Sequence, residues 1–300
     1  MRNLFMILVL SFAVSAAGCQ NAGAPPAGST ASAQLDPHDL SGIWARFGPR
    51  GDRGSNQGSP FREGGDTGFG NDVPPFTPEG QKMFDAIKPG NGRVLGSPEA
   101  AAHPEEHIGR RRAVAEKFQN DPTGQCTPSG LTRIILSTYF APMELIHAKD
   151  RVIQHFDWTT DQRTIFTDGR QLPSEPQLLR WNGFSAGRWE GDTFVVESNG
   201  FQENSWVDQF GYPHSDQMRL EERYRRIAPD RLELNMTLTD PKVYTKPWVS
   251  QKKVFRLLPK EESTIEEGWS DLLDNRCVPS EEFSFNANIR NPAGGKVSRN

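Results

Sequence analysis

The sequence has few cysteines, no long hydrophobic run and no excess of positive charge, and each absence excludes a class of protein. Three cysteines in 300 residues, with no C-x-x-C pair, exclude a zinc ribbon. The apolar run Leu4–Val14 is too short to span a bilayer as a mature helix. A formal net charge of -4 provides no cationic field for DNA or RNA. Glycine and proline are abundant, at 28 and 23 residues, which disfavours a long helical bundle.

The first 18 residues have the order of a secretory signal peptide. Arg2 precedes the apolar run, and the small residues SAAG follow it. Cys19 then resembles the lipidated cysteine of bacterial lipoproteins, so we expect a lipid anchor there; ordinary cleavage after Ala16 is the alternative. Residues 19–36, rich in Ala, Gly, Pro and Ser, predict a flexible tether. We therefore expect an exported protein, anchored in the cell envelope through its lipid and facing the periplasm.

Two cysteines remain once Cys19 carries the lipid. An exported chain can hold Cys126 and Cys277 as a disulfide, with a stabilisation of about 2–4 kcal/mol. Two separate buried thiols are the alternative reading.

Short runs rich in Ile, Val, Phe, Tyr and Trp recur beyond residue 132 and predict one β-rich domain over residues 37–280. Residues 48–125 form an insertion of loop and two short helices, expected at 77–87 and 104–118 from their start and stop signals. The polar tail 286–300 is expected to be disordered. Strands are predicted at 43–46, 133–140, 143–148, 151–158, 163–167, 186–190, 193–198, 217–227, 231–239 and 251–258.

Short turns between consecutive strands predict an antiparallel meander. Gly191-Asp192 suits a type II′ turn, and that register places Trp189 opposite Phe194 as a stabilising cross-strand pair. Closing the meander removes exposed edges. The expected fold is therefore mainly β, an antiparallel lipocalin-like barrel; a two-sheet β-sandwich is the alternative.

Two resemblances support an exported β protein. Gly42-Ile43-Trp44 resembles the G-x-W of lipocalins, whose barrels hold small apolar ligands. Residues 37–278 resemble a family of mostly uncharacterised exported bacterial proteins, through the blocks DPTGQC (121–126), DGR (168–170), GRWEGDTFVVES (187–198), GFQENSWVDQFGYPHSD (200–216), EERYRR (221–226) and DPKVYTKPW (240–248). This chain departs from the family at Leu172 and Arg219, where many relatives have His. The resemblance implies no particular activity.

One motif suggests a metal at first sight. His103 to His107 matches H-x-x-E-H, a zinc-protease pattern. Pro104 is best accommodated at the first helical position, which places His103 outside the helix as a cap. We therefore expect neither a metal site nor a cofactor.

Glu222 is a carboxylate on the apolar face of its strand. In the run 217–227 it shares a face with Leu220 and Tyr224, while the other face is wholly polar. A buried carboxylate needs a partner, or its pKa rises. Glu222 is thus a candidate acid/base or ligand anchor; an internal ion pair with Arg226 or another barrel-lining Arg is the structural alternative.

The segment 199–216 combines aromatic and titratable side chains in a long loop. Exposed aromatics on a loop are costly unless they pack or bind, which favours a pocket rim; a lid packed over one barrel end is the alternative. The expected ligand contacts, together with those from 240–248, are Trp206, Phe210, Tyr212, Tyr244 and Trp248.

Two functions follow from these features. The first is an envelope-associated barrel that binds a small, partly apolar molecule. The second is a cofactor-independent hydrolase, lyase or isomerase that uses Glu222 with His214 or Asp208 in the barrel mouth.

Overall fold

A computed structural model describes residues 36–46, 68–87, 120–138, 141–259, 264–266, 269–270, 272 and 277–278. The predicted signal peptide, Cys19, most of the tether, the H-x-x-E-H segment, the helix at 104–118 and the tail 286–300 lie outside these residues. No helix in the described part of the chain is long and apolar enough to cross a membrane.

Strands dominate the described residues, and most follow the predicted ranges. They are β1 (Gly42–Arg46), β2 (Met143–Ala148), β3 (Arg151–Phe156), β4 (Asp161–Phe166), β5 (Phe184–Glu190), β6 (Thr193–Asn199), β7 (Arg219–Ala228), β8 (Arg231–Thr239), β9 (Trp248–Val249), β10 (Lys253–Leu257), β11 (Thr264–Glu266) and β12 (Trp269–Ser270). The α-helices among the described residues are α1 (Pro78–Ala86) and α4 (Leu131–Ser137), and short 3₁₀ helices lie at Pro122–Gln125 and Trp158–Thr160.

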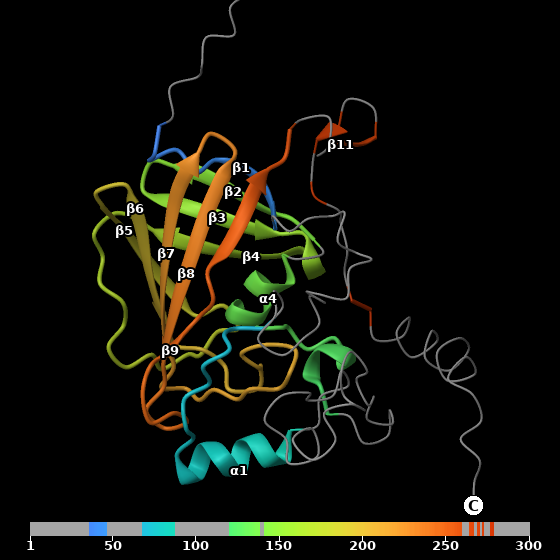
Figure 1. Cartoon of the computed structure of the whole chain (residues 1–300), viewed down its shortest axis with the longest axis vertical. Coiled ribbons are helices and arrows are strands. Elements are labelled where there is room, and N and C mark those ends of the chain that lie inside the picture. The colour runs from blue at the N-terminus through green and yellow to red at the C-terminus, as the bar shows by residue number, and fades with distance from the viewer. Residues whose placement is uncertain are drawn as a thin grey trace, which may run out of the picture. The chain divides into compact units, whose positions relative to one another are not determined.

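Nine of these strands close into a barrel (Figure 1). The order runs β10-β1-β2-β3-β4-β5-β6-β7-β8, and β10 also pairs with β8, which completes the ring. The closed ring confirms the predicted mainly β barrel over the two-sheet sandwich.

One neighbouring pair in the barrel departs from the predicted antiparallel order. Strands β4 and β5 are parallel and pair only at Ile165–Ser185 and Phe166–Ala186. Parallel neighbours need a crossover connection, and residues 167–183 provide it. Because this pairing is so short, the first half of β4 lies beside the end of the crossover without forming strand pairing with it.

The predicted strand at 133–140 is wrong: residues 131–137 form helix α4. All seven of its residues are buried, including the polar Thr132, Arg133 and Ser137, so the helix has no exposed face. A short apolar run such as Ile134-Ile135-Leu136 cannot be distinguished from a buried strand by pattern alone.

The hairpin between β5 and β6 forms in the predicted register. Trp189 faces Phe194, with ring centroids 5.1 Å apart. Gly191 has φ 57°, whereas Asp192 is not among the residues with positive φ, as a type II′ turn requires.

Side chains fill the inside of the barrel. On β7 and β8, alternate residues point inward and are at most 1% exposed: Leu220, Glu222, Tyr224, Leu232, Leu234, Met236 and Leu238. Trp44, Phe156 and Phe255 add large rings from other strands. This barrel has a packed core of the kind that small barrels have.

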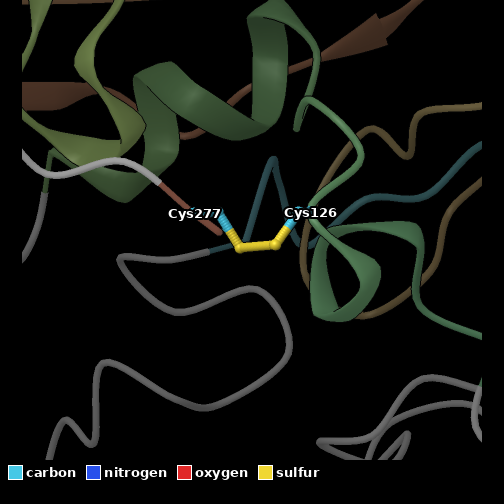
Figure 2. The surroundings of a disulfide bond; sticks show 2 residues. All are labelled: Cys126 and Cys277. Carbon is cyan, nitrogen blue, oxygen red and sulfur yellow. A yellow bond between two sulfur atoms is a disulfide. The ribbon is translucent and has the colours of Figure 1, made fainter. Parts of the chain in front are cut away.

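A disulfide joins Cys126 to Cys277, 151 residues apart in the sequence, and confirms the predicted pairing over separate thiols (Figure 2). Cys126 follows the 3₁₀ helix Pro122–Gln125. The bond thus links the segment that precedes α4 to the chain beyond the last barrel strand.

Candidate functional site

Glu222 lies inside the barrel, as its strand pattern predicts, and forms an ion pair there. Its carboxylate accepts two hydrogen bonds from Arg163 of β4, at 2.8 Å from Nη1 and 2.6 Å from Nη2. The Arg163 side chain is 3% exposed and that of Glu222 is 0% exposed. The partner is therefore another barrel-lining Arg and not Arg226, whose guanidinium donates to the backbone oxygens of Asp39 and Pro229.

Neutral side chains complete the hydrogen bonds of this pair. Tyr224 donates its hydroxyl to Glu222 at 2.8 Å, and Arg163 Nε donates to Gln154 at 2.7 Å. Ser185 lies 3.4 Å from Arg163 Nη1. Burial and the nearby carboxylate raise the pKa of Tyr224 well above its ordinary value. Because the guanidinium neutralises Glu222, the pair is a fixed electrostatic unit and not a free base.

A cavity of about 780 Å³ opens where β4 and β5 lack a ladder. Its volume falls within the range of small-molecule sites, about 300–1,000 Å³. Arg163 and Ser185 belong to both the cavity lining and the buried network. The lining comprises Pro128, residues 161–164, Phe166, residues 170–173 and residues 178–186.

The walls of this cavity, which we term the β4–β5 cavity, combine guanidinium groups with aromatic rings. Arg170 lies 3.6 Å from the ring centroid of Phe166, and Arg180 lies 5.1 Å from that of Phe184. Such stacking holds a guanidinium in place over an apolar surface. The walls can therefore contact both charged and apolar groups of a ligand.

Asp161 and Asn182 connect the two sides of the gap. Asn182 Nδ2 donates to Asp161 Oδ1 at 2.9 Å, and the backbone N–H of Gln162 donates to the same oxygen. Burial raises the pKa of the Asp161 carboxyl, although these hydrogen bonds oppose it. The bond between Asp161 and Asn182 limits how far the gap can widen.

Asp208 and His214, predicted to act with Glu222, make their hydrogen bonds elsewhere. Asp208 accepts from the backbone N–H groups of Phe69 and Phe210, at 3.1 and 2.9 Å. No hydrogen bond in the described part of the chain joins Glu222, His214 and Asp208 to one another. Their convergence on one catalytic centre stays a prediction, and Asp208 has the contacts of a carboxylate that organises a loop.

His214 has a partner that the sequence did not indicate. Its Nε2 lies 2.8 Å from Ser205 Oγ, and its Nδ1 lies 3.2 Å from the carbonyl oxygen of Ser215. Burial lowers the pKa of His214, which favours the neutral ring. A neutral imidazole that donates from Nδ1 to the carbonyl accepts at Nε2 from the serine hydroxyl.

The five aromatic residues expected to contact a ligand are buried. Each is at most 5% exposed: Trp206, Phe210, Tyr212, Tyr244 and Trp248. Tyr212 stacks on Phe84 of α1 at 5.3 Å, and Trp248 packs on Phe69 at 4.8 Å. They have the packing of the alternative reading, a lid over one end of the barrel; none of them lines the β4–β5 cavity.

The residues that do line this cavity carry weak signals in the sequence. Arg163 begins the strand expected at 163–167, and its inward direction follows only from alternation with Ile165. Arg180 lies in a crossover whose path depends on the parallel pairing of β4 with β5, and no local pattern predicts that pairing.

A second cavity, of about 240 Å³, lies between the crossover and the outer face of the barrel. Leu172 and Arg219 both line it. Among the described residues, no group of three or more His, Cys, Asp or Glu side chains is arranged to hold a metal ion.

Comparisons of this chain with protein-family models, with curated proteins and with solved structures find no match.

Proposed function

We propose that this protein is an exported, envelope-associated β-barrel that binds a small, partly apolar molecule in the β4–β5 cavity. The observation that carries the proposal is the size and lining of that cavity, about 780 Å³ with guanidinium groups over aromatic rings. A pocket that offers apolar walls and a few placed polar groups is the usual form of a small-molecule site.

The floor of the cavity supports binding because it is rigid. Arg163 is held by Glu222 and Gln154, so its guanidinium needs no reordering when a ligand enters. A preorganised site loses less conformational entropy on binding than a flexible one.

Export and anchoring rest on separate features. The order of charge, apolar run and small residues before Cys19 is that of a signal peptide. The bond between Cys126 and Cys277 suits an oxidising compartment such as the periplasm. With a lipid on Cys19, the protein would have two partners: the membrane and the small-molecule ligand.

An enzyme is the second candidate function, and one observation favours it. The contact between Ser205 Oγ and His214 Nε2 at 2.8 Å is that of a nucleophile and its base. Gly130 covers this pair, however: a Cβ added at residue 130 would lie 2.3 Å from Ser205 Oγ. Ser205 is 4% exposed and His214 is 1% exposed, so a substrate has no direct access to them.

The proposal is tested by blocking the cavity. Protein purified from periplasmic extract is analysed by native mass spectrometry for retained small molecules, in wild type and in Ala186→Trp, whose indole would occupy the cavity. Thr237→Trp, on the outer face of β8 beside the 240 Å³ cavity, is the matched control. We expect the control to retain the ligand and Ala186→Trp to lose it, with melting curves that show both variants folded. Retention by Ala186→Trp would place binding elsewhere.

A further inference from the structure

We propose that the ligand of the β4–β5 cavity is an amphiphilic monoanion, whose acidic group binds Arg180 and whose apolar part lies against Leu178 and Phe184. This inference rests on the proposed function and specifies the chemistry of its ligand.

The charges of the cavity wall indicate where an anion would bind. Three arginines line the cavity, and two of them are neutralised by carboxylates. Arg163 contacts Glu222 at 2.6 Å, and Arg170 contacts Asp168 at 2.6 Å. Within the part of the chain that the structure describes, Arg180 has no carboxylate within 4.0 Å of its guanidinium. One positive charge of the lining is therefore available to an anion.

The backbone of Arg180 is held in position. Its N–H donates to the carbonyl oxygen of Gly200 at 2.9 Å, and its own carbonyl accepts from the N–H groups of Gly183 and Gln202 at 3.2 and 3.0 Å. The guanidinium also lies over the ring of Phe184. A planar guanidinium that stacks on a ring keeps its N–H edge exposed, and two parallel donors on that edge suit a carboxylate or sulfonate.

The apolar surface beside Arg180 defines the other end of the ligand. Leu178 lines the cavity. This residue is 72% exposed, more than any other large hydrophobic residue in the described part of the chain. A single exposed leucine is ordinary on a protein surface. Here it lies two residues from an unpaired guanidinium at the same cavity, so one amphiphilic molecule can cover both.

Asp161 limits the ligand to one negative charge. Its carboxylate lines the same cavity, and no cationic side chain in the described ranges lies within ion-pair distance of it. A second anionic group near Asp161 would meet a like charge in a partly desolvated wall, which is unfavourable. A monoanion with its acidic group at Arg180 avoids that repulsion.

Two fluorescent probes of similar shape and different charge test the inference. Anilinonaphthalene sulfonate is an anion, and phenylnaphthylamine is its neutral counterpart. We expect wild type to bind the anionic probe more tightly. Arg180→Gln should weaken binding of the anionic probe by about ten-fold or more, the effect of losing a charged hydrogen-bond pair, and should change binding of the neutral probe by less than about two-fold. Arg225→Gln, an exposed β7 position outside the cavity lining, is the matched control and should change neither.

The outcomes separate this inference from the proposed function. If Ala186→Trp abolishes binding of both probes, while Arg180→Gln leaves their affinity ratio unchanged, the cavity binds ligands but the assignment of an anion to Arg180 is wrong. If Ala186→Trp leaves both affinities unchanged, or neither probe binds to wild type, the proposed function fails and the inference fails with it. Melting curves for each variant distinguish lost binding from lost folding.

Discussion

Arg163 and Glu222, 59 residues apart in the sequence, form a two-contact ion pair in the interior of the barrel, with N–O distances of 2.8 and 2.6 Å. The pair connects β4 to β7 through the inside of the barrel, since these strands are not neighbours in the ring. Taking two charges out of water is costly, so the pair stabilises the fold only while both partners are present.

Glu222→Gln should lower the free energy of unfolding by about 3–5 kcal/mol, because it leaves the Arg163 cation buried without a counter-charge. Chemical denaturation followed by circular dichroism measures the change. Glu197→Gln, which removes an exposed carboxylate paired with Arg188, is the control and should cost less than about 1 kcal/mol. The double variant Arg163→Met/Glu222→Gln should recover part of the loss. A Glu222→Gln protein as stable as wild type would show that Glu222 is not a structural partner of Arg163.

Replacing Cys126 and Cys277 by serine should lower stability by about 2–4 kcal/mol, because the closed loop restricts the unfolded chain. The measurement is denaturation with and without reductant. Reductant should destabilise wild type and leave the double serine variant unchanged. Both thiols should also resist alkylation in unreduced protein; ready labelling of either one would contradict the disulfide.

Gly130→Ala should destabilise the protein by more than about 1 kcal/mol. Gly130 has φ +79° and its added Cβ would meet Ser205 Oγ at 2.3 Å, whereas Gly169 has φ +84° and open space around it. Gly169→Ala therefore reports the backbone strain alone. The difference in melting temperature between the two variants measures the destabilisation caused by the clash of the added Cβ with Ser205. Equal melting temperatures would show that the Ser205 side chain moves aside without cost.

Stability should fall as the pH drops from 7 towards 5. Burial lowers the pKa of His214 below its ordinary value of 6.5. Below 6.5, the unfolded chain binds a proton that the folded chain does not, so acidification favours unfolding. Burial lowers the pKa of His147 in the same direction. His214→Gln should reduce the slope of unfolding free energy against pH, and His38→Gln, at an exposed position, should preserve it. An unchanged slope in His214→Gln would contradict a neutral buried ring.

Cys19→Ala should release the protein from membranes if Cys19 carries the lipid. Fractionation of cells that express each form measures the release, and palmitate labelling of wild type tests the lipid itself. Wild type that incorporates no palmitate would favour ordinary cleavage after Ala16.

Strands in which apolar and polar residues alternate could be predicted from the sequence. Features that depend on pairing between distant segments could not. Leu232, Leu234, Met236 and Leu238 mark an inward face by their period of two, and all four are 0% exposed. Helix α4 is buried on every side, so its short apolar run Ile134–Leu136 does not distinguish a helix from a buried strand.

The candidate site depended on information that a single sequence does not contain. Glu222 could be placed inside the barrel because its neighbours at i−2 and i+2 are apolar. Its partner Arg163 comes from β4, a strand that is not a neighbour of β7 in the ring, and which strands face each other across the interior depends on the crossover between β4 and β5. The aromatic loop residues were expected at a rim because their composition is that of a binding loop, but the partners that bury them, such as Phe69 and Phe84, come from a distant segment.

Closure of the ring depends on β10, the last barrel strand in the sequence. Strand β1 pairs with β10 at Trp44–Leu257, and β8 pairs with β10 at Leu234–Lys253. Until residues 253–257 are synthesised, the edge of β1 has no partner, and the edge of β8 is paired only at Thr237 and Leu238, by β9. Unpaired edges recruit strands from other chains. A chain truncated before residue 253 should therefore aggregate.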